Sequence, residues 1–121
     1  MATTVAQIIT IRVRKALNDV VSQPNDARWS DTLDLIPFLA DGQNIIFDQR
    51  SEELLNTDGI TKKTITEPTA LTDTLQVSDK WRLALMHYVC ARAFEMPGKQ
   101  RQNLEAATYH DDLFWKMIET L

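Results

Sequence analysis

Residues 75–96 read LQVSDKWRLALMHYVCARAFEM and contain the longest dense apolar segment of the chain. Ser78 and Asp79 are both favoured at helix N-caps, and an acidic side chain there complements the positive end of the helix dipole. Apolar residues then recur on nearly every side of a helix, which predicts burial on several sides. Pro97 lacks an N–H and disfavours helical geometry at the residue before it. We therefore predict a central helix over residues 79–95, with the other elements packed around it.

The composition indicates a single globular domain over residues 1–121, because 44% of the residues are hydrophobic and 25% are charged. The net charge of -4 leaves no basic excess to neutralise phosphates, which argues against a general nucleic-acid or membrane-surface binder. Cys90 is the single cysteine, so the chain has no intramolecular disulfide and no cysteine cluster for zinc. We expect no secretory signal, no membrane span and a reducing compartment.

Two helices are predicted before the central one. The first covers residues 4–20, since Thr4 and Gln7 have the spacing of a capping box and an apolar stripe follows them. The second covers residues 31–53 and begins after Ser30, a favoured N-cap residue.

The second helix contains two residues that disfavour a regular helix. Pro37 costs about 3 kcal/mol in a helix interior and Gly42 costs about 1 kcal/mol relative to alanine. We expect either a kink at Pro37 or a short first turn followed by the main helix. Leu33 belongs to the predicted apolar stripe of this helix, and Leu104 to that of a last helix over residues 100–120. The predicted fold class is therefore mainly α, a four-helix, bundle-like domain.

Residues 54–77 interrupt the helical pattern between the second and third helices. They are rich in threonine, have a turn signal at Asp58–Gly59, and contain two plausible short strands over residues 61–66 and 74–77. We expect an extended arm or a β-hairpin, and a long insertion of this kind in a small domain usually has a task, often contact with a partner; a disordered segment is the alternative. The candidate partner-contact residues are Thr61, Lys62, Lys63, Thr64, Ile65 and Thr66.

A second candidate contact is a modest basic group around the start of the last helix. It comprises Lys99, Arg101 and Lys116. A solvated helix face is the default explanation for such a group. Lys62 and Lys63 have a similar alternative, since lysines on a strand also discourage unwanted edge pairing.

Candidate catalytic and metal-binding residues are sparse. His87 and Cys90 are three residues apart, a spacing at which two side chains can bind one metal, although a buried core cysteine and a partly buried histidine explain the same pattern. His87, His110 and Asp111 faintly resemble the metal ligands of certain phosphohydrolases. The chain has neither a Gly-x-Ser-x-Gly elbow nor a glycine-rich phosphate loop. We therefore predict no catalytic site, no metal and no cofactor.

Three segments occur in an order that is informative when they are taken together. They are VAQIITIRVRKALND at residues 5–19, RWSD at 28–31 with LADGQ at 39–43, and LQVSDKWRLAL at 75–85 with YV at 88–89 and RAF at 92–94. In order and approximate spacing they resemble a family of head-to-tail adaptor (connector) proteins of tailed bacteriophages. The chain departs from the family at Ala40 and Gly42, where asparagine and alanine are usual.

The resemblance implies a structural virion protein of the neck between capsid and tail, made in the host cytoplasm. Copies would form a ring, commonly a dodecamer, that docks on the portal protein and connects it to the next neck or tail component. Genomic DNA would only pass through the lumen, which a net negative charge suits because basic walls would bind phosphates. The segment 61–66 would be an arm that pairs with the strand edge of a neighbour or partner. The alternatives are a generic small cytosolic helical protein–protein interaction module and a metal-dependent hydrolase.

Overall fold

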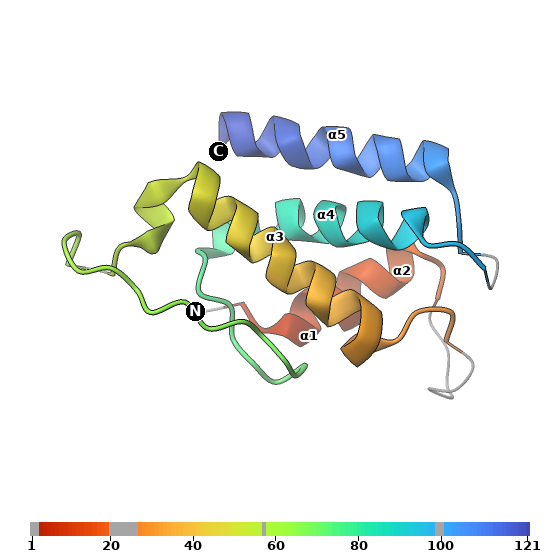
Figure 1. Cartoon of the computed structure of the whole chain (residues 1–121), viewed down its shortest axis with the longest axis horizontal. Helices are drawn as coiled ribbons and strands as arrows, with labels where there is room; N and C mark the ends of the chain where they lie inside the picture. Colours follow the sequence, from red (N-terminus) through yellow and green to blue (C-terminus); the bar gives the residue numbers. More distant parts are fainter. Residues whose placement is uncertain (1–2, 20–26, 57, 99–100) are drawn as a thin grey trace.

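The computed structural model describes residues 3–19, 27–56, 58–98 and 101–121, in which helices surround one hydrophobic core (Figure 1). The predicted mainly-α, bundle-like fold is confirmed, because the described ranges are mainly helical and contain no β-strand. The central element is α4 (Arg82–Glu95), against which α1, α3 and α5 all pack. No helix within those ranges is both long enough and apolar enough to span a bilayer.

The central helix has nearly the predicted bounds. A 3₁₀ turn, η5 (Asp79–Trp81), leads into α4, and Met96 leaves the helix with extended backbone before Pro97. Eight of the fourteen residues of α4 are buried, as predicted from the apolar residues on nearly every side of this helix. The predicted N-cap is wrong in one respect. Ser78 occupies the cap position, but its hydroxyl donates to Glu53 instead of capping the helix.

The first helix forms in three consecutive segments: α1 (Val5–Ile8), the π-helical η1 (Ile9–Val13) and α2 (Arg14–Ala16). The predicted capping box is confirmed, since Gln7 N donates to Thr4 Oγ1 and Thr4 N donates to Gln7 Oε1. The helix ends at Ala16, before the predicted end at residue 20, because Asn18 adopts a left-handed φ of 55°, which asparagine tolerates better than most residues. Residue 20 lies outside the described ranges.

The second helix begins with a π-helical turn, η3 (Asp31–Leu35), and continues as α3 (Ile36–Gln49). The Oγ of Ser30 accepts from Leu33 N, so the predicted N-cap is confirmed. Pro37 lies in the first turn of α3, where a missing N–H is tolerated, which agrees with the predicted short first turn followed by the main helix. The predicted end at residue 53 is wrong. The backbone leaves the helix at Arg50, and a 3₁₀ turn, η4 (Ser51–Leu54), follows.

Gly42 permits the close approach of α3 to α4. A Cβ at this position would lie 3.0 Å from Leu85 Cδ2 and 3.0 Å from Tyr88 Cδ2, which is closer than a normal van der Waals contact. The low helix propensity of glycine is therefore offset by the packing that it allows.

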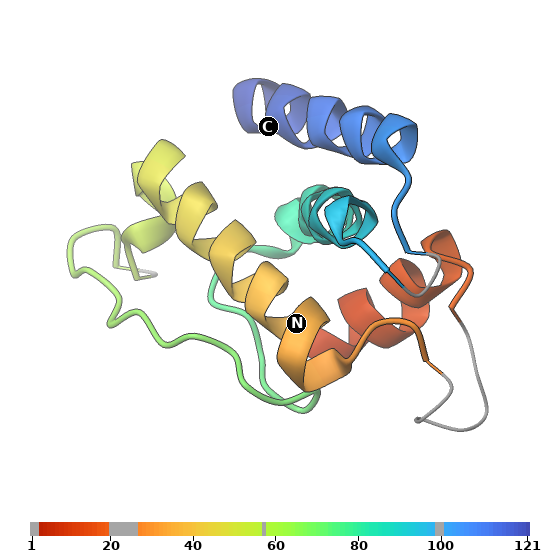
Figure 2. The same ribbon diagram turned by 45° about the vertical axis from the view of Figure 1, so that its right-hand side comes forward.

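The last helix, α5 (Leu104–Thr120), runs antiparallel to α4 and packs mainly on it (Figure 2). It begins later than the predicted residue 100 because Asn103 is the N-cap, its Oδ1 accepting from Ala106 N. The prediction that Leu104 and Leu33 belong to buried apolar stripes is wrong. Leu104 is 60% exposed and Leu33 is 81% exposed, since each precedes the part of its helix that meets a neighbour.

Candidate partner-binding arm

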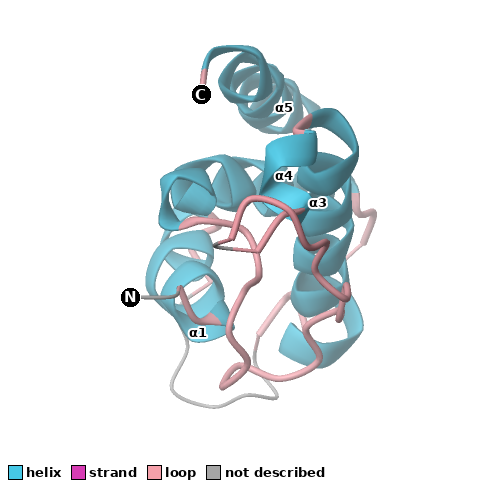
Figure 3. Ribbon diagram, turned by 90° about the vertical axis from the view of Figure 1, so that its left-hand side faces the viewer, coloured by secondary structure: helices cyan, strands magenta, loops and turns pink. Residues whose placement is uncertain are grey.

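The segment between η4 and η5 forms an extended arm that leaves the helical body and returns to α4 (Figures 1 and 3). Its first part turns back on itself, with an antiparallel bridge between Leu55 and Lys62. Asn56 N donates to Thr61 O at 2.8 Å, and Lys63 N donates to Leu54 O at 2.6 Å. The predicted β-hairpin is therefore limited to this short pairing.

The two predicted strands, over residues 61–66 and 74–77, do not form. The second segment pairs instead with the start of the chain, through a bridge between Thr74 and Thr4 and a 2.8 Å hydrogen bond from Leu75 N to Thr3 O. The strand prediction from threonine-rich composition is therefore wrong, because each segment finds a different partner.

The tip of the arm is an ordered turn. Asp58 Oδ1 accepts from Ile60 N and from Thr61 N, both at 2.9 Å, and Gly59 adopts a left-handed φ of 72°. The hydrogen bond from the Thr61 hydroxyl, together with the backbone donors, lowers the pKa of Asp58. The predicted turn is confirmed, and it presents Ile60 with 84% of its surface exposed.

A buried glutamine of α3 fastens the base of the arm. Gln43 is fully buried, its Oε1 accepts from Gln76 N at 3.0 Å, and its Nε2 donates to Thr66 O at 3.4 Å. The Gln76 side chain in turn bridges the other segment, accepting from Thr66 N and donating to Thr64 O. Two amide side chains thus hold both segments of the arm on the helical body.

A second group of hydrogen bonds, between Glu53 and Ser78, holds the two ends of the arm together. The buried carboxylate of Glu53 accepts from Ser78 N at 2.8 Å and from the Ser78 hydroxyl at 2.6 Å and 2.8 Å. Burial raises the pKa of Glu53, but the hydrogen bonds from Ser78 outweigh it, so the net pKa lies below the ordinary value. The residues on either side of the arm are therefore held together, and backbone hydrogen bonds from Val5 N to Asp73 O and from Ala6 N to Leu71 O hold its second half on the first helix.

The two lysines of the arm differ in their surroundings. Lys63 donates from Nζ to Gln76 O at 2.7 Å and lies 6.0 Å from the Phe47 ring, so it helps to hold the arm. Lys62 is exposed and makes no ion pair with the described residues.

Ile65 is the residue of the arm best placed to meet a partner. Its side chain is 48% exposed, and its backbone makes no hydrogen bond within the described ranges. Beside it lies an open depression of about 370 Å³, lined by Asn44, Phe47, Asp48, Ser51, Leu54 and Ile65. An extended segment with free backbone groups next to a partly apolar hollow can accept a strand or a side chain of another protein.

The predicted basic group does not assemble around the start of α5. Arg101 donates to Pro97 O and Arg28 O and lies 3.9 Å from Asp34, so it connects loops of the same chain. Lys116 is exposed near the other end of α5, about 18 Å farther along the helix than its first residue. Lys99 lies outside the described residues. Sequence reasoning missed that an arginine beside a proline–glycine turn can be bound by the turn's carbonyl groups.

The two histidines meet at the interface of α4 and α5. His87 Nδ1 lies 2.8 Å from His110 Nδ1, a hydrogen bond in which one ring must donate and the other accept. Burial lowers the pKa of both imidazoles, and the neighbouring His110 lowers that of His87 further. The His110 ring also stacks on Phe94 at 5.9 Å. The pair therefore joins the two helices most effectively when it is not doubly protonated.

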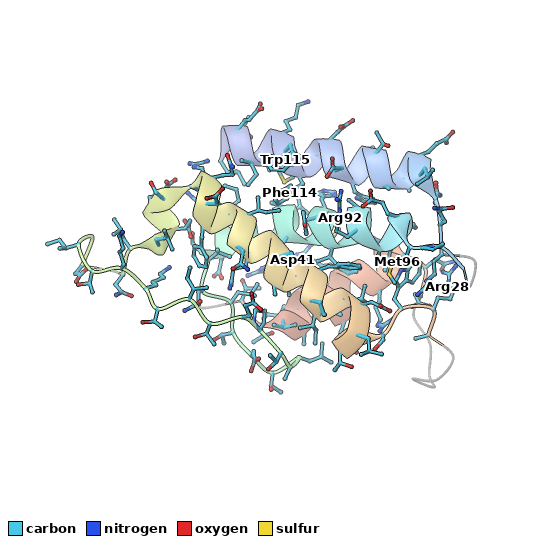
Figure 4. The ribbon with its side chains drawn as sticks, viewed as in Figure 1. Arg28, Asp41, Arg92, Met96, Phe114 and Trp115 are labelled. Atoms are coloured by element: carbon cyan, nitrogen blue, oxygen red, sulfur yellow. The ribbon has the colours of Figure 1, made fainter. Side chains whose placement is uncertain are left out.

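The other residues of the suggested metal sites, Cys90 and Asp111, make different contacts. Asp111 pairs with Arg92 at 2.8 Å on another side of α5, and Figure 4 shows Arg92 between α4 and α5. Cys90 is buried against Met86, and burial raises the pKa of its thiol to about 12. No set of three or more His, Cys, Asp or Glu side chains with metal-binding geometry exists within the described ranges.

The segments that carry the resemblance meet at one corner of the helical body. Asp19, at the end of the first segment, accepts from Arg14 and from the backbone N–H groups of Arg28 and Trp29. The indole of Trp29 donates to Ala93 O at 3.0 Å. These residues therefore specify how the helices pack, whereas Gln43 of the LADGQ segment positions the arm.

In comparisons with known proteins, no family model, no curated sequence and no solved structure matches the chain.

Proposed function

We propose that this protein is a non-enzymatic head-to-tail adaptor of a tailed bacteriophage, which forms a ring under the portal and connects it to the next neck or tail component. The observation that carries the proposal is the arm of residues 55–77, whose turn at residues 58–61 projects while the remainder is bonded along the helical body. The resemblance of the three sequence segments supports the same assignment. In this proposal the protein is made in the host cytoplasm and functions in the virion neck.

The arm has the properties of a preorganised contact. The bonds of Gln43 and Glu53 fix its base before any partner binds, which lowers the entropic cost of ordering a loop on binding. Ile60 and Ile65 then present apolar side chains outside the helical body. Ile65 also offers a free backbone edge, and edge pairing gives affinity through the main chain and specificity through side chains.

A binding measurement with a matched control tests the proposal. The portal ring of the parent phage is immobilised, and binding of the wild type is compared with that of Ile65→Asp and Leu33→Asp. Both positions are exposed isoleucine or leucine residues, but Leu33 lies on η3, away from the arm. We expect Ile65→Asp to weaken binding by about tenfold or more and Leu33→Asp to leave it nearly unchanged.

Two results would contradict the proposal. A wild type that does not bind the portal ring favours the generic helical interaction module. Equal weakening by both variants excludes the arm as the contact. Far-UV circular dichroism of each variant confirms that the helical body is intact.

A further inference from the structure

The outer face of α5 is covered by no other element of the described chain. One side of the helix is buried on α4 through Ala107, Phe114 and Ile118. The rest of the helix surface exposes three large apolar or aromatic side chains: by helical spacing Tyr109, at 61% exposure, lies opposite the buried side, whereas Leu104 at 60% and Trp115 at 39% flank it. Figure 4 places Phe114 and Trp115 on α5, next to each other in sequence but with different environments. Trp115 and Tyr109 border the outward surface of α5, and exposed aromatic side chains are typical of a contact surface.

The same face has a line of acidic groups. Glu105, Asp112 and Glu119 are seven residues apart, so they follow one another along the helix with only a small angular drift. All three are exposed, and none forms an ion pair with the described residues. Lys116 is the single lysine or arginine of α5. The outer face of α5 is therefore apolar and net negative.

The N-terminal helix has the opposite character. Residues 3–18 include three basic residues and no acidic residue. Arg14 forms ion pairs with Asp19 and Asp31. Arg12 and Lys15 are exposed and make no ion pair with the described residues. Ile11, between them on η1, is 53% exposed. This face is therefore apolar and net positive.

The two faces point away from each other. Both α5 and the α1–η1 segment pack on α4, and they lie on opposite sides of it (Figures 1 and 3). A single molecule cannot satisfy the acidic face with its own basic face. Two molecules can, when the η1 face of one meets the α5 face of the next.

We infer that the outer face of α5 binds the η1–α2 face of a second copy of this chain, so that copies join head to tail. The contact is heterologous, because different surfaces of the two copies meet, and such contacts close into a ring when the rotation per copy permits. The inference rests on the ring assembly proposed above and assigns the two surfaces that form it. Exposed ion pairs mainly steer and align the copies, while Ile11, Tyr109 and Trp115 supply apolar contact.

Charge exchange between the two faces provides the test. The α5 variant is Asp112→Lys with Glu119→Lys, and the η1 variant is Arg12→Glu with Lys15→Glu. The matched control is Asp41→Lys with Asp48→Lys, which makes the same charge change at two exposed positions, also seven apart, on α3. Self-association of the protein alone is measured by sedimentation velocity at low and at high ionic strength, with circular dichroism as a check of folding.

The wild type and the control should associate, and salt should weaken both because it screens exposed charges. Each charge-reversed variant alone should associate at least about tenfold more weakly than the wild type. An equimolar mixture of the two variants should associate again. The basic α5 face of the α5 variant then meets the acidic η1 face of the η1 variant. The unchanged η1 face of the α5 variant and the unchanged α5 face of the η1 variant keep their native, opposite charges.

Four results would overturn the inference: a monomeric wild type, variants that associate as strongly as the wild type, a mixture that stays dissociated, or a control that loses association as strongly as the α5 variant. If the wild type associates and neither variant changes this, the ring assembly stands but uses other surfaces. If the charge exchange succeeds and the wild type does not bind the portal ring, the head-to-tail contact stands and the adaptor function fails.

Discussion

Replacing Gln43 by methionine should detach the arm from the helical body without removing the arm itself. Methionine has a similar volume and fills the buried site, but it neither accepts from Gln76 N nor donates to Thr66 O. An unsatisfied buried polar group costs about 1–3 kcal/mol. The 3.4 Å bond to Thr66 is the weaker of the two, so we expect a total loss of about 2 kcal/mol in the free energy of unfolding.

The loss converts into a measurable change in melting temperature. Unfolding entropy is about 2.1 cal/mol/K per residue, which gives roughly 0.25 kcal/mol/K for a chain of this length. A loss of about 2 kcal/mol therefore lowers the melting temperature by about 8 °C. Urea unfolding followed by far-UV circular dichroism gives the free energy, and hydrogen exchange with mass spectrometry reports the opening of residues 61–77.

The matched control is Gln49→Met, on the same helix but exposed and bonded only to its neighbour Asp48. Surface changes of this kind usually stay within about 0.5 kcal/mol. The reasoning is refuted if Gln43→Met matches this control in stability, or if it is destabilised while amide exchange in the arm stays as slow as in the wild type.

Three further predictions concern the helical body. Gly42→Val should destabilise the fold by about 1–3 kcal/mol in urea unfolding, because its side chain overlaps the Tyr88 ring, and an unchanged midpoint would contradict the close approach of α3 and α4. Burial lowers the pKa of His87 and His110, so below about pH 6.5 the unfolded state binds more protons than the folded state. The contribution of the pair to the free energy of unfolding should therefore be full above that pH and fall in acid. Replacing one histidine, as in His110→Asn, should flatten the plot of melting temperature against pH between about pH 7.5 and 5. An equally steep profile in the variant would exclude the histidine pair as the cause. Trp29→Phe deletes the indole bond to α4 and leaves a void, so it should cost about 2 kcal/mol by chemical denaturation, and a change below about 0.5 kcal/mol would show that this bond contributes little.

Local patterns in the sequence predicted the elements whose causes are local. The capping box of Thr4 and the N-cap of Ser30 depend on residues within one helical turn, and both form as expected. The dense apolar segment before Pro97 predicted a helix buried on several sides, since few arrangements hide so many apolar side chains. The turn at Gly59 also has a local cause in the Asp58 side chain.

Contacts between distant segments could not be predicted in the same way. The helix pattern treats Gly42 only as a weak helix former, and its value becomes visible once Tyr88 lies against it. Ser78 was expected to cap a helix, but the buried carboxylate of Glu53 competes for the same hydroxyl. Arg101 was expected on a basic surface, although backbone carbonyls of two loops bind it.

The arm shows the same division. Its position between two helices follows from composition, because residues 54–77 lack a helical stripe. Its attachment depends on Gln43, thirty-three residues before its partner Gln76, and no periodicity in either segment indicates that pair. Thr74, in a segment predicted to be a strand, pairs with Thr4 near the start of the chain.

The proposed docking on the portal can be tested by light scattering, which gives the mass of the portal ring of the parent phage alone and mixed with an excess of this protein. We expect a heavier particle whose added mass corresponds to one copy of this chain per portal subunit. A portal ring of unchanged mass, with this protein remaining separate at every ratio, would contradict it.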